Sequence, residues 1–238
     1  MDNNEEMEDI VEQFELNQEA NEGLQAIDAM ENRALHGCFV TPIFESTIKD
    51  EYKGVLEGVR RTILEMKKNK EGAFEFGNFV TVDNLQDDPR FDKLKQIILT
   101  EADTAMSQLS WKRDAIYVNG MWANATNTTH RHMVHTHPNS MMSGIIHIQS
   151  PDGAGPTTFA DPRPGARVME LNVDEYSELN GGVMMLAPKE GRMLLWPSWL
   201  PHGVEVPREA HTKDRIVVAF NIMCIASVNT KTASVRYN

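Results

Sequence analysis

The chain has 238 residues, 41% of them hydrophobic, and a formal net charge of −12. This length allows one domain with a large core, and the negative charge argues against a phosphate backbone or an anionic bilayer as partner. No apolar run reaches the roughly 20 residues that a membrane-spanning helix needs. The acidic start MDNNEEMEDI is not a signal peptide, and two distant cysteines indicate a reducing compartment. We therefore expect a soluble, cytoplasmic protein.

Residues 1–32 contain acidic side chains but no lysine or arginine. Apolar residues at helical spacing, among them Ile10, Val11 and Phe14, predict one or two amphipathic helices or a partly disordered arm. We expect this acidic arm to be separate from a single domain over residues 33–238. An amphipathic arm could dock on that domain or mediate a homo-oligomer.

The next part of the chain is predicted to be mainly helical. Residues 49–71 and 90–110 have apolar side chains three and four positions apart, as in FDKLKQIILTEADTAMSQL, which predicts two amphipathic helices. Between them, residues 74–85 (FEFGNFVTVDNL) favour an extended conformation.

From about residue 111 the pattern changes to short β-branched and apolar segments separated by glycine and proline. Many short strands at close spacing predict an α+β, mainly β fold, with a barrel or cupin-like jelly roll flanked by the N-terminal helices. The predicted strands lie near residues 114–125, 132–137, 142–150, 156–161, 182–188, 192–197, 202–206 and 215–225.

The segment THRHMVHTHPNS, residues 129–140, concentrates four histidines. Residues two apart on a strand share a face, so His135 and His137 would point together and could chelate one metal ion. His130 and His132 form a second pair of opposite parity, so a regular strand directs only one pair into a pocket. A surface or hydrogen-bonded pair is the alternative.

Two later residues could complete a site with this pair. His202 follows an apolar strand and a proline-rich turn, and in a jelly roll it could supply a third imidazole from another strand; otherwise it caps a loop. Arg215 begins the apolar strand RIVVAFN, where a buried guanidinium needs an anionic partner. That partner would be an internal carboxylate or a dicarboxylate cosubstrate.

The motifs HTHPNSMMSGIIHIQSP, FADPR, WPSWLPHGVEV and RIVVAFNI, in this order, resemble the Fe(II)- and 2-oxoglutarate-dependent oxygenase family with an HxHPNSxxSG motif. Its members occur in phages and marine bacteria, and a phage-encoded member would act in the host cytoplasm. The resemblance spans residues 38–226 and implies a double-stranded β-helix. It implies that His135 and His202 bind iron and that Arg215 holds the distal carboxylate of 2-oxoglutarate. The implied reaction uses O2 to hydroxylate a C–H bond while 2-oxoglutarate is decarboxylated to succinate.

The chain departs from the wider superfamily at two positions. His137 stands where a carboxylate usually completes the facial triad, so the third ligand could be His137, Asp161 or water. Asp161 is better explained as a turn residue paired with Arg163. Val217 stands where a serine or threonine is common, which leaves Asn221 and Asn139 as polar candidates for holding the cosubstrate.

Two other classes of protein fit parts of the pattern. A cupin-type metal enzyme without 2-oxoglutarate would share the jelly roll and the histidines, but the glutamate that cupins usually carry after HxH is missing here. A non-catalytic jelly-roll binding module would leave the histidines and Arg215 unexplained. For an enzyme, the acidic composition favours a small-molecule or peptide substrate over nucleic acid.

Overall fold

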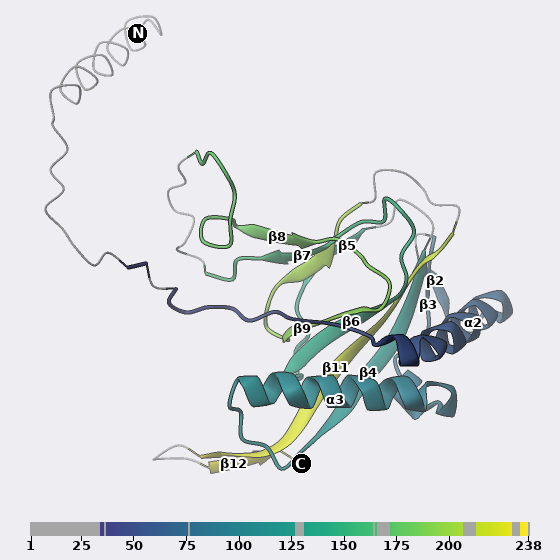
Figure 1. Cartoon of the computed structure of the whole chain (residues 1–238). Coiled ribbons are helices and arrows are strands. Elements are labelled where there is room, and N and C mark those ends of the chain that lie inside the picture. Colours follow the sequence, from purple (N-terminus) through teal and green to yellow (C-terminus); the bar gives the residue numbers. More distant parts are fainter. Residues whose placement is uncertain are drawn as a thin grey trace, which may run out of the picture. The chain divides into compact units, whose positions relative to one another are not determined.

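Figure 1 shows the computed structural model of the chain. It describes residues 34–35, 37–75, 77–126, 131–163, 165, 172–206, 213–229 and 234–237. The chain divides into two units, Met1–Phe39 and Val40–Asn238, and the fold below is that of the second unit. The helices predicted for the acidic arm lie outside the described residues.

Two antiparallel sheets form the second unit, as predicted for a jelly roll. From β4 to β11 the chain passes repeatedly between the sheets, so segments distant in sequence become neighbours. The larger sheet has the order β1 (Phe44–Thr47), β9 (Arg192–Pro197), β6 (Met142–Gln149), β11 (Arg215–Asn229), β4 (Ala115–Thr126), β3 (Asn78–Val80) and β2 (Ala73–Glu75), with β12 (Ser234–Tyr237) paired to β11. The smaller sheet has the order β5 (His132–His135), β10 (His202–Val204), β7 (Thr157–Ala160) and β8 (Val183–Leu186).

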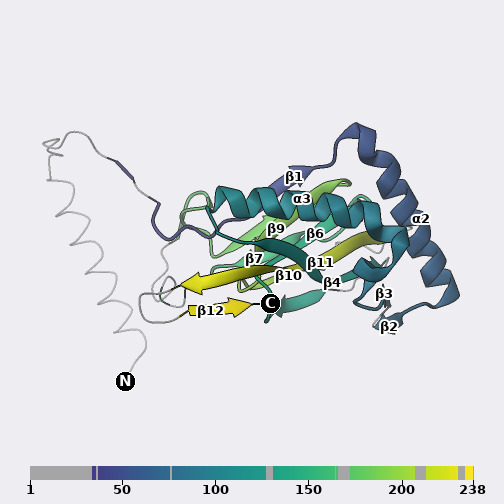
Figure 2. The ribbon, with the colours of Figure 1, turned by 90° about the horizontal axis from the view of Figure 1, so that it is seen from below.

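Two helices, α2 (Lys53–Asn69) and α3 (Asp92–Gln108), cover one face of the larger sheet (Figure 2). Both match the predicted helical segments. The buried side chains of α2 recur at spacings of three and four, which forms one apolar stripe. The helix ends at Asn69, and the left-handed backbone of the next residue, Lys70 (φ 59°), closes the last turn. Three short 3-10 helices, Asp50–Tyr52, Leu85–Asp87 and Pro89–Phe91, join these elements.

The apolar core has two parts. One cluster joins the helices to the adjoining face of the larger sheet. The other lies between the sheets, where Phe159 of the smaller sheet packs with Leu194 and Trp196 of the larger one. Each face of the central strands is therefore buried, so the residues of β6 and β9 do not alternate between buried and exposed positions.

The eight strands predicted after residue 111 are all present, with small differences at their ends. Strand β5 ends at His135 rather than at residue 137, and β10 ends at Val204 rather than at residue 206. The short β1 was not predicted; only two of its four residues are partly buried, and it forms by pairing with β9. No helix in the described residues combines the length and apolar character needed to cross a bilayer.

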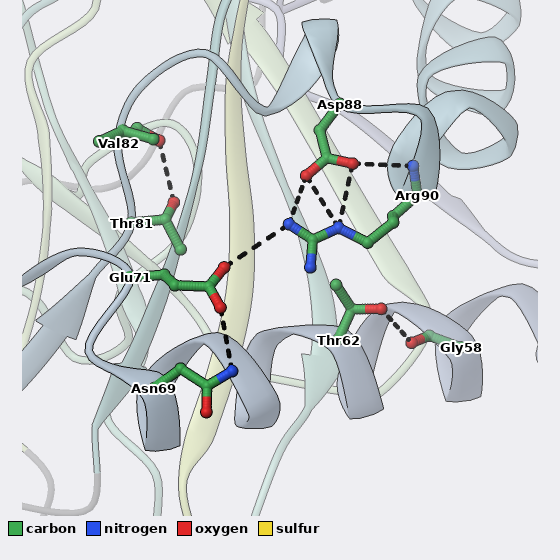
Figure 3. Close-up of polar contacts among 8 residues, drawn as sticks. All are labelled: Gly58, Thr62, Asn69, Glu71, Thr81, Val82, Asp88 and Arg90. Atoms are coloured by element: carbon green, nitrogen blue, oxygen red, sulfur yellow. Dashed lines mark hydrogen bonds and ion pairs between the residues drawn. The ribbon is translucent and has the colours of Figure 1, made fainter.

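Arg90 links the turn before α3 to the end of α2 (Figure 3). Its Nη2 donates to Oδ2 of Asp88 at 2.6 Å and lies 3.7 Å from Oε2 of Glu71. Asn69 donates to the other oxygen of Glu71 at 3.0 Å. The hydrogen bonds from Arg90 lower the pKa of the Asp88 carboxyl. Because Arg90 and Glu71 are largely exposed, this network adds little stability, and apolar packing holds the helices in place.

This packing predicts that alanine substitutions at two adjacent residues of α2 differ in their effect on the free energy of unfolding. Ile63 is fully buried and Leu64 is 38% exposed. We expect Ile63→Ala to lower the free energy of unfolding by about 2–5 kcal/mol, because it leaves a cavity under the sheet. The control Leu64→Ala should stay within about 1 kcal/mol of the wild type in urea unfolding. Equal effects of the two substitutions would contradict the packing described here.

Candidate metal and cosubstrate site

Three histidines meet between the two sheets. His202 at the start of β10 lies directly opposite His135 at the end of β5, with ring centroids 4.5 Å apart. His137 follows two residues later; its backbone N–H donates to the carbonyl of Ser198 at 3.0 Å, and its ring lies 5.1 Å from that of His202. One ligand atom from each of the three rings lies within 4.8 Å of the other two. We call His135, His137 and His202 the histidine triad.

Two rings of the triad have the same hydrogen-bond arrangement. Nδ1 of His135 lies 2.8 Å from the carbonyl oxygen of Met133, and Nδ1 of His202 lies 2.9 Å from that of Leu200. Nδ1 must carry the proton to donate to a carbonyl, which leaves the lone pair of Nε2 for a metal. The indole nitrogen of Trp196 lies 3.2 Å from Nδ1 of His202 but cannot donate to a nitrogen that is already protonated. We therefore assign the hydrogen bond of Nδ1 to the carbonyl of Leu200, which is the shorter contact.

Burial keeps two rings of the triad in the form that binds metals. Burial is the main reason that the pKa of His202 and that of His137 are lowered to about 4 each, and the neighbouring histidines contribute to both shifts. At neutral pH both imidazoles are therefore uncharged. A neutral imidazole is the form in which histidine ligates iron or zinc.

The approach of β5 to β10 depends on a glycine. A Cβ atom on Gly203 would lie 2.7 Å from the carbonyl oxygen of His132, too close for any other residue without a shift of the backbone. The pairing also contains an irregularity: His135 faces His202, but His132 faces Val204, so β5 has one extra residue.

This extra residue corrects the expectation from strand parity. His132 would point away from His135 on a regular strand, yet it lines the same pocket, with its ring centroid 5.7 Å from that of His135. The opposite-parity argument was wrong for His132 because the strand is bulged. His130 lies outside the described residues.

The triad opens into a pocket that extends to Arg215 at the start of β11. The cavity is about 80 Å³, several times the roughly 15 Å³ that one water needs on the same measure, so a small organic anion could enter. Its other lining residues come from both sheets and include Asn78, Trp122, Asn124, Ile145, Thr157, Trp196 and Val217.

Arg215 is buried without a full set of partners. It is only 6% exposed, and its Nε and Nη2 atoms have no hydrogen-bond partner among the described residues. Burial lowers its pKa to about 10, so it remains charged at neutral pH. Nε and Nη2 lie side by side on one edge of the guanidinium and match the two oxygens of a carboxylate.

A neutral histidine lies on the neighbouring strand. His147 of β6 is fully buried, pairs with Val217 across the sheet, and has no hydrogen bond from either ring nitrogen within the described residues. Burial, together with the positive charges of Arg215 and Arg192, lowers its pKa to about 3. His147 therefore supplies no negative charge to Arg215.

Asp161 lies in the turn after β7 and pairs with Arg163, as the sequence suggested. Nε and Nη2 of Arg163 donate to its two carboxylate oxygens at 2.9 and 2.7 Å, and the backbone N–H of Arg163 donates to Oδ1 at 3.0 Å. Asp161 is not part of the cluster formed by the histidine triad.

The two asparagines predicted to hold the cosubstrate lie elsewhere. Asn139 occupies a turn with φ 64° and borders a second pocket, which it shares with residues such as Trp111. Oδ1 of Asn221 accepts a hydrogen bond from Ser143 at 2.8 Å. Neither asparagine lines the pocket that contains Arg215.

Sequence reasoning overlooked two residues near Arg215. His147 and Thr157 lie within apolar strands, and the sequence was read there as core. The only sequence signal was a histidine and a threonine at positions facing inward; their unpartnered polar atoms become visible only in three dimensions.

Residues 120–221, which contain the histidine triad and Arg215, match a family described as "Putative 2OG-Fe(II) oxygenase". Solved structures with a similar fold include SnoN, the non-heme alpha-ketoglutarate-dependent epimerase from nogalamycin biosynthesis, at 9% identity and TM-score 0.58, covering 80% of this chain and 79% of that chain. A Pseudomonas putida prolyl-4-hydroxylase matches at 10% identity and TM-score 0.54, covering 76% and 92%. AviO1 from Streptomyces viridochromogenes matches at 13% identity and TM-score 0.51, covering 76% and 90%.

No curated protein matches the chain in sequence. The family match over residues 120–221, on a jelly-roll fold with three clustered imidazoles, indicates an enzyme of the 2OG-Fe(II) oxygenase class. This class uses Fe(II) as cofactor and 2-oxoglutarate as cosubstrate. The match therefore favours the oxygenase interpretation over the cupin and binding-module interpretations.

The buried His147 predicts an acid-dependent loss of stability in the metal-free protein. Its pKa falls from 6.5 to about 3 on folding, so its contribution to stability is complete above pH 6.5 and is lost as the pH falls toward 3. We expect this residue to account for about 1.4 kcal/mol per pH unit below about pH 6.

Urea unfolding in chelator, between about pH 7.5 and 5, measures this slope. His147→Leu should flatten the pH dependence of the unfolding free energy by about one proton. A pH dependence identical to that of the wild type would contradict the low pKa.

Proposed function

We propose that the protein is an Fe(II)- and 2-oxoglutarate-dependent hydroxylase in which the histidine triad binds iron and Arg215 binds the distal carboxylate of 2-oxoglutarate. One observation carries this proposal. Three imidazoles that can ligate a single ion open into the same pocket as a buried arginine with an unpartnered pair of N–H groups. Metal at one end and a carboxylate at the other would satisfy both.

The residues fit both groups chemically. Imidazole nitrogen is a suitable ligand for iron, and three protein ligands leave positions for a chelating keto acid and for oxygen. With His137 in place of a carboxylate, the ligand set is neutral, so the bound ion would keep one more positive charge than in the usual triad. An anionic keto acid is favoured by this charge.

When bound, iron and 2-oxoglutarate supply the oxidative chemistry that hydroxylates a C–H bond with O2 and yields succinate and carbon dioxide. The protein supplies orientation. The carbonyls of Met133 and Leu200 fix two of the rings, and the rings of Phe159 and Trp196 pack around His202. Arg215 fixes the far end of the cosubstrate, and the largely apolar walls of the pocket exclude water.

The substrate we propose is a small molecule or a single side chain of a peptide. The small cavity and its indole and aliphatic walls, such as Trp122 and Ile145, favour an apolar C–H group next to the triad. SnoN, whose fold is similar at 10% identity and TM-score 0.55, has been solved in complex with Fe3+, alpha ketoglutarate and nogalamycin RO. The free cysteines Cys38 and Cys224 support a cytoplasmic location.

The ligand assignment predicts which substitutions remove iron. We expect His202→Ala and His137→Ala each to weaken Fe(II) binding at least about 100-fold, since losing a ligand should exceed the effect of losing an outer partner. Asp161→Ala is the matched control and should leave the affinity within about twofold. Anaerobic calorimetric titration measures each affinity. An unaltered affinity in His202→Ala, or a large loss in Asp161→Ala, would show that the ligands are different.

The clamp assignment predicts a selective loss of 2-oxoglutarate. Arg215→Ala should weaken 2-oxoglutarate binding at least about 100-fold, because it removes two charge-assisted hydrogen bonds, and should leave Fe(II) binding within about twofold. Anaerobic addition of Fe(II) and then 2-oxoglutarate, followed by the visible spectrum, should give a charge-transfer band only with both in the wild type. Equal losses of iron and 2-oxoglutarate in the variant would rule out a specific clamp.

A further inference from the structure

The Arg215 end of the pocket needs more than one hydrogen-bond donor. A carboxylate has two oxygens with about four lone-pair sites, and the Nε and Nη2 groups of Arg215 can occupy only two of them. In a buried pocket, the remaining sites have no bulk water and require other donors. The residue at the family's usual position for such a donor, Val217, has none.

Thr157 offers a donor in the right place. It lies at the start of β7, is only 2% exposed, and lines the same pocket as Arg215. Its side chain shares a strand face with Phe159, whose ring lies 5.0 Å from Trp196 and 6.4 Å from His202, so this face points into the space between the sheets. Its Oγ1 has no hydrogen-bond partner among the described residues.

The asparagines near this end of the pocket fit this role less well. Nδ2 of Asn78 donates to Oδ1 of Asn124 at 3.0 Å, and the atom of Asn78 left without a partner is its oxygen. An oxygen accepts hydrogen bonds and would repel a carboxylate. Asn221 already accepts from Ser143 and does not line the pocket.

The groups around His147 also favour an incoming anion. His147, beside Val217, is neutral, and Arg192 is the second positive group that lowers its pKa. Nothing among the described residues neutralises the Nε and Nη2 edge of Arg215. The hydroxyl of Thr157 and the edge of Arg215 are therefore both unoccupied donors within one pocket.

We propose that Thr157 is a specificity-determining residue that donates its hydroxyl hydrogen to the distal carboxylate held by Arg215, in the role left vacant by Val217. The proposal rests on the proposed function, since it assumes that 2-oxoglutarate occupies this pocket. Thr157 thereby selects a dicarboxylate keto acid over a monocarboxylate of the same length.

The test compares two ligands that differ only at the distal end. Calorimetry on the Mn(II)-loaded full-length protein measures the affinity for 2-oxoglutarate and for 2-oxopentanoate, which has a methyl group in place of the distal carboxylate. Thr157→Val keeps the shape and removes the hydroxyl, and Thr157→Ser keeps the hydroxyl. The matched control is Thr158→Val, since Thr158 is also buried (5% exposed) but lies on the opposite face of β7.

We expect Thr157→Val to weaken 2-oxoglutarate at least about tenfold and to leave 2-oxopentanoate and Mn(II) unchanged, as for loss of one hydrogen bond to a charged group. Thr157→Ser and Thr158→Val should bind both acids like the wild type. If the valine variant does not fold, Thr157→Ala provides the same comparison. Wild-type affinity for 2-oxoglutarate in the folded variant, or an equal loss of both acids, would overturn the role of Thr157.

Failure of the proposed function itself would look different. The wild type would then bind both acids equally, or Arg215→Ala would leave the affinity for 2-oxoglutarate unchanged.

Discussion

The burial of the positive charge of Arg215 without a paired acid among the described residues is the constraint around which the site is arranged. Removing a guanidinium from water is costly unless it is paired. Here the cost is offset by the strand that carries it: on the opposite face of β11, Ile216, Val218 and Phe220 are fully buried against the helices. Fully burying such a side chain contributes about 1.5–3 kcal/mol. The fold thus holds in place a buried cation whose Nε and Nη2 have no partner among the described residues.

The division of the site between two sheets explains how it can be both rigid and open. Arg215 belongs to the larger sheet, which is braced by α2 and α3, while His135 and His202 belong to the smaller one. Phe159 and Trp196, in contact across the two sheets, fix their separation. Gly203 allows β5 and β10 to approach closely enough for the histidine rings to converge. The distance between the metal end and the carboxylate end of the pocket is therefore set by core packing.

The two departures from the superfamily pattern have a common consequence. In the proposed site, His137 would put a neutral ligand where the superfamily has a negative one, and Val217 puts an apolar group where a hydroxyl donor is common. The first increases the positive charge at the metal end of the pocket, and the second leaves the carboxylate end short of a donor unless Thr157 supplies it. In the proposed site, both changes would make the recognition of 2-oxoglutarate depend on electrostatics and on a residue from a different strand. The family pattern alone would miss this dependence.

The sequence by itself determined the jelly-roll fold, both helices and eight of the nine strands described after residue 111, because alternation and helical spacing are local properties. Its motifs also pointed to the three residues of the histidine triad. It pointed to Asp161 as a turn residue for the same reason. Only the tertiary structure decided that His132 joins the pocket through an extra residue in β5, that Asn139 and Asn221 lie away from it, and that Thr157 and His147 lie near Arg215. Those facts depend on the register between strands far apart in sequence and on whether a buried polar atom finds a partner across the barrel. No pattern within a single strand carries that information.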